Sequence, residues 1–244
     1  EEIGNTLDNL ENLETKTYGD LKIYSGNWIF SKNSLKQNIY LSIAWSGWGK
    51  VSAARAATRI IGHQFSERQL DAILFTGVAG AINSKLKQWD IVIPNELIQH
   101  DMDARPFFKK YEIPALKTER IKSEKSISNW VINTLKNSKK DGSLEIFGNL
   151  YQGLVATGDK FINNKKEFEE ITKNVKDLLV VEMEGASVAQ VAKQEKIPFQ
   201  IIRVVSDEAN ESSSQDFNEF ILKYNSYSSK LLSALIENIE SAPF

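Results

Sequence analysis

Two glutamates follow directly on a run of four apolar residues in the last third of the chain. Glu182 and Glu184 end the segment LLVVEME, and a second apolar run, PFQIIRVVSD, ends in Ser206 and Asp207. Carboxylates held at the ends of buried strands are suited to binding sugar hydroxyls and to acid–base chemistry. Each also has an ordinary structural alternative: Glu184 as a first-turn helix acid and Asp207 as a cap.

The elements expected around these groups follow a repeated order of strand, glycine turn, helix and strand. The first unit covers 38–80, with its helix at 51–65, and the second covers 177–207, with its helix at 185–196. The apolar or small residues at helical spacing are Val51, Ala54, Ala57, Ile60 and Ile61 in the first helix and Val188, Val191 and Ala192 in the second.

Further strands are expected at 89–94 and 151–156, so the chain favours an α/β sheet with helices on both faces. The two strands of each unit should run parallel, which places their carboxyl ends on one edge of the sheet. We therefore expect Glu182 and Glu184 to lie near Ser206 and Asp207. The turns SGWGK and TGVAG should open on the same side, where open α/β sheets usually bind ligands.

Composition limits the class of protein. The chain has 244 residues, of which 41% are hydrophobic and 25% charged, and we expect one globular domain spanning 1–244. The formal net charge is −2, and the Lys-rich stretch 109–140 is interpreted as a solvated helical face. Nucleic acid is therefore not an expected partner.

Other function classes are disfavoured by residues that are rare or missing. The sequence contains no cysteine and only two histidines, so thiolate chemistry is excluded and a His-rich metal site is not expected. No apolar run approaches the roughly 20 residues of a membrane span. The cytoplasm is the predicted compartment, and an exported form stays open because the sequence begins with Glu1.

Three stretches of the chain resemble the nucleoside phosphorylase superfamily and, within it, the 5′-methylthioadenosine/S-adenosylhomocysteine nucleosidases. They are VVEMEGASVAQVAKQEKIPFQIIRVVSDEAN at 180–210, FTGVAGAINSKLKQWDIVIP at 75–94 and GLVATGDKFI at 153–162. The resemblance implies a three-layer α/β/α domain around a central mixed, mostly parallel sheet. It also implies a homodimer without a cofactor, acting on a small nucleoside.

The implied reaction is hydrolysis of the N-glycosidic bond of methylthioadenosine and S-adenosylhomocysteine, with 5′-deoxyadenosine as a further substrate. In this family pattern Asp207 is the general acid at adenine N7, and Ser206 holds it in place. Arg203 belongs to the network that holds the attacking water. Glu2 aligns with the base that activates this water, although Glu1 and Glu2 could also be ordinary first-turn helix acids.

The resemblance further implies a set of binding residues. Glu184 accepts both ribose hydroxyls, Met183 packs along the sugar, and Glu182 lies in the supporting network. The other residues implied are Phe161 and Ile162 at the adenine, Val78, Ala79, Gly80 and Trp48 in the two glycine turns, Phe217 at the 5′ substituent, and Phe107 and Pro114 of the partner subunit. His100 and Asp101 match a His-Asp stretch of the family, for which a structural role is expected.

The chain departs from the family pattern in three places. Val78 replaces a serine, which removes a hydroxyl near the attacking water, and Trp48 replaces an isoleucine, which narrows the pocket. The stretch KKYEIP differs from the family sequence before the partner's proline. The 5′ end of the pocket is therefore less well defined than the adenine end.

Two other functions stay open. A phosphorylase of the same superfamily would need an anion site, for which Arg55 and Arg59 are the candidates, although they are interpreted as solvated helix residues. An exported binding protein that keeps the fold is the second. Relatives usually open with a short apolar strand that ends at the base. We therefore expect about ten further residues upstream that form this strand, with Glu2 at its C-terminal end, and the spacing of Ile3, Leu7 and Leu10 predicts a helix after it.

Overall fold

The structure is a computed structural model that describes residues 4–32, 35–62, 70–209 and 213–244. The strands are β1 (Leu10–Tyr18), β2 (Leu21–Lys32), β3 (Leu35–Ala44), β4 (Ile73–Ala81), β5 (Ile91–Gln99), β6 (Ile121–Lys122), β7 (Leu150–Thr157), β8 (Leu178–Glu182) and β9 (Phe199–Asp207). The α-helices are α1 (Lys50–Gly62), α2 (Lys125–Lys140), α3 (Lys165–Asn174), α4 (Gly185–Gln194), α5 (Ser213–Tyr224) and α6 (Ser228–Ile236), and two 3₁₀ helices span Gly4–Asn9 and Ile239–Ser241.

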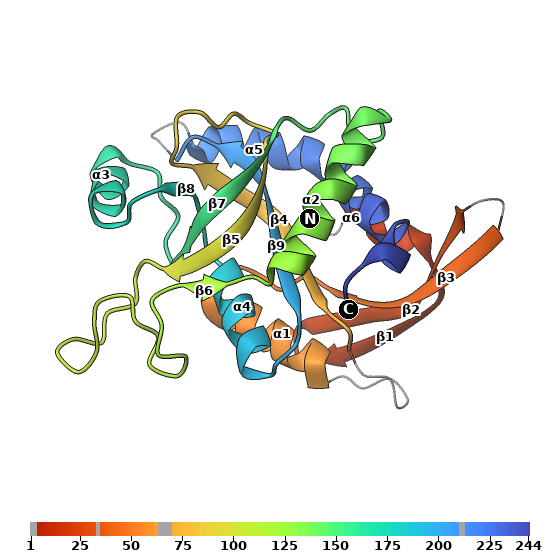
Figure 1. Cartoon of the computed structure of the whole chain (residues 1–244), viewed down its shortest axis with the longest axis horizontal. Helices are drawn as coiled ribbons and strands as arrows, with labels where there is room; N and C mark the ends of the chain where they lie inside the picture. Colours follow the sequence, from red (N-terminus) through yellow and green to blue (C-terminus); the bar gives the residue numbers. More distant parts are fainter. Residues whose placement is uncertain (1–3, 33–34, 63–69, 210–212) are drawn as a thin grey trace.

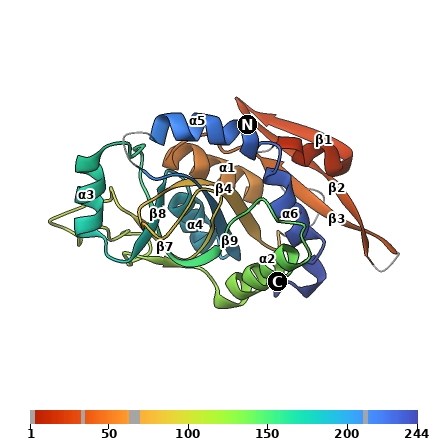
Figure 2. The ribbon, with the colours of Figure 1, turned by 90° about the horizontal axis from the view of Figure 1, so that it is seen from above.

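The strands form two sheets. The larger has the order β6-β5-β7-β8-β4-β9, and an additional pairing of β5 with β9 closes it on itself (Figure 1). Its three longer pairings, β4–β9, β5–β7 and β7–β8, are parallel, and its short ones are antiparallel. The mixed sheet expected from the sequence is confirmed. The smaller sheet is the antiparallel β1-β2-β3, which lies at the opposite end of the molecule from α3 (Figure 2).

Helices cover both faces of the larger sheet, which confirms the three-layer α/β/α fold. On one side α1 and α4 pack on the sheet in a core that includes Ala53, Ala189 and Ile201. On the other side α2, α5 and α6 pack in a second core that includes Val131, Phe220 and Leu231. Strand β9 is buried along its whole length, as expected for a strand covered on both faces.

The predicted apolar face of the first helix was partly wrong. Val51 is 80% exposed, and the buried residues of α1 are Ala53, Ala56 and Ala57. These small side chains let α1 lie close to α4, whose own buried face is also rich in alanine. The predicted face included Ala57 but was otherwise displaced around the helix, because the close packing against α4 selects the stripe of small residues. In α4, burial of Val188 and Ala192 was predicted correctly.

The first predicted strand–helix–strand unit does not form within one sheet. β3 pairs with β2, and among the described residues its other edge has no strand partner. β4 pairs with β8 only from Gly80 onward, so the earlier part of that edge is also unpaired within the described ranges. A cavity of about 250 Å³ lies between these two edges, lined by residues that include Leu41, Ile43, Leu74 and Thr76.

The N-terminal predictions fall partly outside the described residues. Glu1, Glu2 and Ile3 are not among the residues described. Leu7 lies in the 3₁₀ helix Gly4–Asn9, whereas Leu10 begins β1, so the helix expected there is shorter than predicted. Leu10 is buried against Trp28 and Phe30 of β2 and against Ile236 of α6, and this packing favours a strand at that point.

The second unit positions the candidate site, but not as predicted. β4 runs parallel to β9 and antiparallel to β8, so β8 and β9 run in opposite directions. The expectation that β8 and β9 run parallel was wrong. β4 lies between them in the sheet, and it pairs parallel with β9 but antiparallel with β8. The carboxyl ends still meet, since Gly80 pairs with Val181 on one side and with Asp207 on the other.

No helix in the described ranges is long and apolar enough to cross a membrane. The described residues likewise contain no group of three or more histidines and acids arranged to hold a metal ion.

Candidate active site

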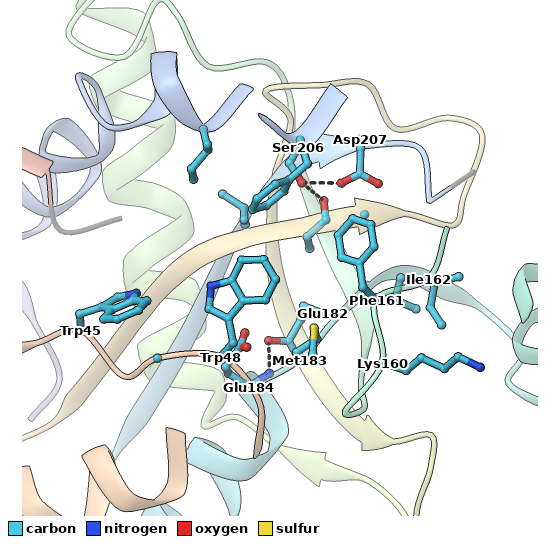
Figure 3. A pocket seen from close by; sticks show the side chains of 17 residues that line it. Trp45, Trp48, Lys160, Phe161, Ile162, Glu182, Met183, Glu184, Ser206 and Asp207 are labelled. Atoms are coloured by element: carbon cyan, nitrogen blue, oxygen red, sulfur yellow. Dashed lines mark hydrogen bonds between the residues drawn. The ribbon is translucent and has the colours of Figure 1, made fainter. Parts of the chain in front are cut away.

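The carboxyl ends of β4, β8 and β9 open onto a cavity of about 260 Å³ (Figure 3). The turn between β8 and α4 carries Met183 and Glu184 into it, and β9 ends there with Ser206 and Asp207. Each of these residues follows an apolar strand that is held in the core. The rigid sheet therefore fixes where their side chains begin.

Asp207 is a buried carboxylate held by short hydrogen bonds. The Ser206 hydroxyl lies 2.7 Å from Asp207 Oδ2, and the backbone N–H of Ala209 donates to Oδ1 at 2.8 Å. Gly80 lies directly beneath, and a Cβ at that position would come within 3.0 Å of Asp207 Oδ1 and 3.1 Å of the Ala209 Cβ. The turn predicted at TGVAG was wrong, because residues 76–80 continue to pair with β9 as part of β4. The missing Cβ of Gly80 lets β4 approach the acid closely.

Glu182 is the internal anchor of the site. Its Oε2 accepts hydrogen bonds from Arg203 Nη2 at 2.6 Å and from the backbone N–H of Gly185 at 2.6 Å. Its Oε1 accepts a short hydrogen bond from the Thr157 hydroxyl. Both side chains of the Glu182–Arg203 pair are 1% exposed, and the Arg203 guanidinium also lies over the ring of Phe75. The carboxylate of Glu182 thus fixes the turn that carries the next two residues.

Glu184 joins two walls of the cavity. Its Oε1 accepts a hydrogen bond from the backbone N–H of Gly49 at 2.8 Å. Gly49 adopts φ +88°, in the left-handed region that favours glycine, and it ends the SGWGK turn after β3. The carboxylate of Glu184 is therefore held at the rim of the cavity, where a ligand hydroxyl can reach it.

Aromatic rings form the remaining wall. Phe217 of α5 contacts Phe161 at a ring-centroid distance of 5.9 Å and Trp48 at 5.8 Å, both edge to face. Trp48 lines the cavity and is 58% exposed, so its side chain is accessible to a ligand. A flat, apolar group such as a purine fits between rings of this kind.

The structure brings most of the predicted site residues together. Those that line the cavity are Trp48, Val78, Ala79, Gly80, Phe161, Ile162, Glu182, Met183, Glu184, Ser206, Asp207 and Phe217. Arg203 lies behind the cavity on Glu182, and Phe107 and Pro114 of the same chain are not among its lining residues. Glu2 lies outside the described residues, and the catalytic roles of the whole set remain predictions.

Five lining residues were missed: Trp45, Gly47, Lys160, Val181 and Ile221. Trp45 and Gly47 belong to the same glycine turn as Trp48, and Lys160 and Val181 adjoin predicted residues. Ile221 follows Phe217 by four positions in α5, and this helical spacing was the signal that could have found it. Lys160 points away from Glu184 and Asp207 in Figure 3 and pairs with Glu167 at 2.6 Å.

The comparisons with known proteins agree with this geometry. A sequence profile described as the phosphorylase superfamily matches residues 1–237. The chain belongs to the phosphorylase superfamily. A curated superfamily relative, the 5′-methylthioadenosine/S-adenosylhomocysteine nucleosidase of Bacillus subtilis strain 168, is 32% identical over 240 residues, which is 98% of this chain and 95% of that protein.

Several solved structures match the fold over almost the whole chain. The methylthioadenosine/S-adenosylhomocysteine nucleosidase of Neisseria meningitidis, in complex with methylthio-immucillin-A, has a TM-score of 0.81 and 29% identity, covering 97% of this chain and 94% of that one. The S-adenosylhomocysteine nucleosidase of Streptococcus pyogenes, in complex with 5-methylthiotubericidin, has a TM-score of 0.82 and 28% identity, covering 98% and 92%. A futalosine hydrolase of Helicobacter pylori has a TM-score of 0.81 and 27% identity, covering 97% and 93%.

Proposed function

We propose that the chain hydrolyses the N-glycosidic bond of 5′-methylthioadenosine and S-adenosylhomocysteine, releasing adenine and the thioribose. The observation that carries this function is that Asp207 and Glu184 line one aromatic-walled cavity. Relatives named for these two substrates match nearly the full chain. 5′-Deoxyadenosine is a further predicted substrate, because it keeps the adenine and the ribose hydroxyls.

The base end of the cavity supplies the acid. In glycosidic hydrolysis the sugar becomes oxocarbenium-like while negative charge builds on the departing base. Asp207 donates a proton to adenine N7 as the bond breaks, with Ser206 holding its carboxyl group. Phe161 stacks on the adenine ring, and the backbone of the neighbouring Ile162 reads the edge of the base.

The sugar end binds the ribose hydroxyls. Glu184 accepts both hydroxyls, as a carboxylate with two oxygens can, and the Gly49 N–H keeps it oriented. Met183 packs along the sugar. Glu182 acts through the backbone, because its oxygens are occupied by Arg203, Thr157 and the N–H groups of the turn. The proposed base for the attacking water is Glu2, which lies outside the described residues.

A phosphorylase is not favoured. It would need cationic groups beside the ribose, whereas Lys160 is the only lysine, arginine or histidine among the residues that line the cavity within the described ranges. Arg55 pairs with Asp20 at 2.7 Å, and Arg59 lies over the ring of Tyr18, so both are occupied elsewhere on exposed α1 surface. A binding protein without catalysis is not favoured either, since Asp207 and Glu184, the proposed acid and ribose carboxylate, line the same cavity.

Incubation of the purified protein with methylthioadenosine, with and without phosphate, tests the proposal. Free methylthioribose and adenine are expected under both conditions. Formation of methylthioribose 1-phosphate, or adenine release that requires phosphate, would assign phosphorolysis instead. Futalosine serves as a competing substrate in the same assay, and a strong preference for it would reassign the substrate.

We also propose a homodimer with composite sites. Phe107 is 86% exposed and Phe108 is 41% exposed, on the segment that extends from the body between β5 and β6 (Figure 1). Large apolar side chains displayed together favour a protein contact. In the dimer, Phe107 and Pro114 of the partner subunit close the 5′ end of the cavity.

A further inference from the structure

Three charged side chains from distant parts of the chain form a closed ring of contacts at the rim of the cavity. Lys50 begins α1, Asp101 follows β5, and Asp159 follows β7. Lys50 Nζ lies 2.7 Å from Asp101 Oδ1, and Asp101 Oδ2 accepts a hydrogen bond from the backbone N–H of Asp159 at 3.0 Å. Asp159 Oδ1 accepts from the backbone N–H of Lys50 at 2.7 Å, which closes the ring.

This ring joins the two segments that carry Trp48 and Phe161, the two rings that contact Phe217 in the aromatic wall of the cavity. Trp48 lies two residues before Lys50, and Phe161 lies two residues after Asp159. Gly49 lies between them, where a Cβ would come within 3.0 Å of Asp159 Oδ1. The backbone N–H of the same glycine donates to Glu184 Oε1. Hydrogen bonds and short stretches of backbone therefore link the ring to Glu184, Trp48 and Phe161.

The segment after β7 is also held by contacts of Gly158 with Glu182 and His100. The backbone N–H of Gly158 donates to the Glu182 carbonyl at 3.1 Å. The ring of His100 packs directly against Gly158, where a Cβ would lie 2.2 Å from His100 Nε2. Glu182 and His100 therefore hold the backbone at Gly158, and the Lys50–Asp101–Asp159 ring holds the backbone at Asp159, just before Phe161.

The ring is partly shielded from water. The side chain of Lys50 is 20% exposed, that of Asp101 is 32% exposed and that of Asp159 is 48% exposed. Burial by itself would raise the pKa of Asp101, but the hydrogen bonds from Lys50 and from the Asp159 N–H hold it below its usual value. Asp101 is thus ionised at neutral pH. Asp159 in turn accepts at the first N–H of α1, where a negative charge is favoured.

We propose that Asp159 is a positioning residue that, through Lys50 and Asp101, fixes the separation of the Trp48 and Phe161 side chains and so sets the affinity for the nucleoside. The proposal rests on the proposed function, because it assigns Phe161 to the adenine. Contact with these two side chains holds the substrate before and during bond cleavage alike. Loosening their positions therefore weakens binding more than it slows the bound substrate.

The test compares Asp159→Ala with the wild type in both catalysis and binding. The KM for methylthioadenosine is expected to rise about ten-fold and the Kd for adenine to rise in parallel, while kcat changes by less than about two-fold. Asp159→Asn keeps an oxygen that can accept from the Lys50 N–H, so it should recover part of the affinity. A KM and an adenine Kd that stay at the wild-type values, or a fall in kcat alone, would overturn the proposal.

Two further variants make the result independent of folding defects. Lys50→Met removes the ammonium group, keeps the aliphatic stem and should also raise KM. The double variant Lys50→Met/Asp159→Ala should raise KM little beyond either single variant, because both residues act in one ring. Asp20→Ala breaks an ion pair of the same length on α1 with Arg55 and should leave KM unchanged. A strictly additive double variant, or an equal effect of Asp20→Ala, would contradict the ring as the cause.

The outcomes also separate this inference from the proposed function. A wild-type protein that releases no adenine from methylthioadenosine refutes the proposed function. A wild-type protein that does release adenine, together with an Asp159→Ala variant of unchanged KM, refutes only the positioning role.

Discussion

The Ser206 hydroxyl lies 2.7 Å from Asp207 Oδ2 and 3.2 Å from the carbonyl oxygen of Ala79. A hydroxyl has one hydrogen and can accept as well as donate. When Asp207 is ionised, Ser206 can donate to it. When Asp207 carries a proton, it can donate to Ser206, which then donates to Ala79. The pair therefore accommodates the acid before and after it transfers a proton, without movement of the backbone.

Asp207→Asn is expected to lower kcat for methylthioadenosine by roughly 10²–10⁴, the range typical of general acid catalysis. The amide keeps the size and polarity of the side chain but has no acidic proton to transfer, so adenine binding should largely survive. Single-turnover rates and an adenine Kd measure the two effects. Ser206→Ala is the matched control and should cost less, since it removes only the group that holds the acid. Near-normal turnover in Asp207→Asn would remove Asp207 as the acid.

Glu2→Gln should reduce turnover strongly while leaving adenine binding near the wild-type value. The carboxylate is the proposed base for the attacking water, and the amide cannot take up its proton. Hydrolysis rates at saturating methylthioadenosine, with adenine binding as the control, measure this. Glu1→Gln is the neighbouring control and should be nearly silent. Equal turnover in Glu2→Gln and the wild type would exclude Glu2 as the base.

Mixed dimers test whether each site is built from two subunits. Glu184→Gln should be inactive because the ribose hydroxyls lose a charged acceptor, and Phe107→Ala should be impaired because the partner's site stays open. Unfolding and refolding the two variants together should restore activity, since one site of each mixed dimer then has Glu184 and the partner's Phe107 intact. Each variant refolded alone is the control. A mixture no more active than the sum of its parts, or a monomeric mass with full activity, would contradict the composite site.

Trp48→Ile should shift the preference between substrates. Trp48 packs edge to face on Phe217 at the 5′ end of the proposed site, so a smaller side chain leaves room for the longer 5′ group of S-adenosylhomocysteine. The ratio of kcat/KM for S-adenosylhomocysteine to that for methylthioadenosine is expected to rise by about ten-fold. The ratio is its own control for loss of active protein. An unchanged ratio would show that Trp48 does not limit the 5′ end.

His100 makes the folded state sensitive to mild acid. Burial lowers the pKa of His100 below its usual 6.5, and this effect exceeds the raising effect of the nearby Asp101 charge. The Lys50 charge adds a smaller lowering. As the pH falls, His100 therefore binds a proton near pH 6.5 in the unfolded chain but only at lower pH in the folded chain. Stability should fall as the pH drops from 6.5 to the folded pKa, by at most about 1.4 kcal/mol per pH unit from this group. Urea unfolding between pH 7.5 and 5 measures the slope.

His100→Asn removes this titration and should flatten that slope. His63, the other histidine of the sequence, is present in both proteins and so does not distinguish them. Identical slopes in the variant and the wild type would show that His100 does not carry the effect.

Several features could be read from local sequence. β8 and β9 are buried on both faces and therefore appear as unbroken apolar runs, and the acids at their ends are adjacent in sequence to those runs. Gly80 was also predicted as a site residue, although the turn predicted at TGVAG was wrong, because residues 76–80 continue β4 up to its close approach to Asp207. Such signals depend on neighbours in the chain, which a sequence displays directly.

Strand direction and sheet membership could not be read in this way. β8 and β9 each follow the expected pattern, yet β4 separates them and reverses their relation. β3 has the apolar character of a central strand but pairs with β2 in the smaller sheet. Both outcomes depend on hydrogen bonds between segments far apart in sequence, and strands of either direction share the same apolar pattern.

The sequence by itself determined which residues are candidates for the site, because Glu184, Ser206 and Asp207 stand at the ends of runs that must be buried. Only the tertiary structure decided how the walls of the cavity are held. Gly49 and Glu184 are 135 positions apart, and Lys50, Asp101 and Asp159 come from three separate elements. Charged side chains at helix starts and strand ends are common, and nothing local marks which will meet. Their pairing follows from the closed sheet, which brings the ends of β5, β7 and β8 to one rim beside α1.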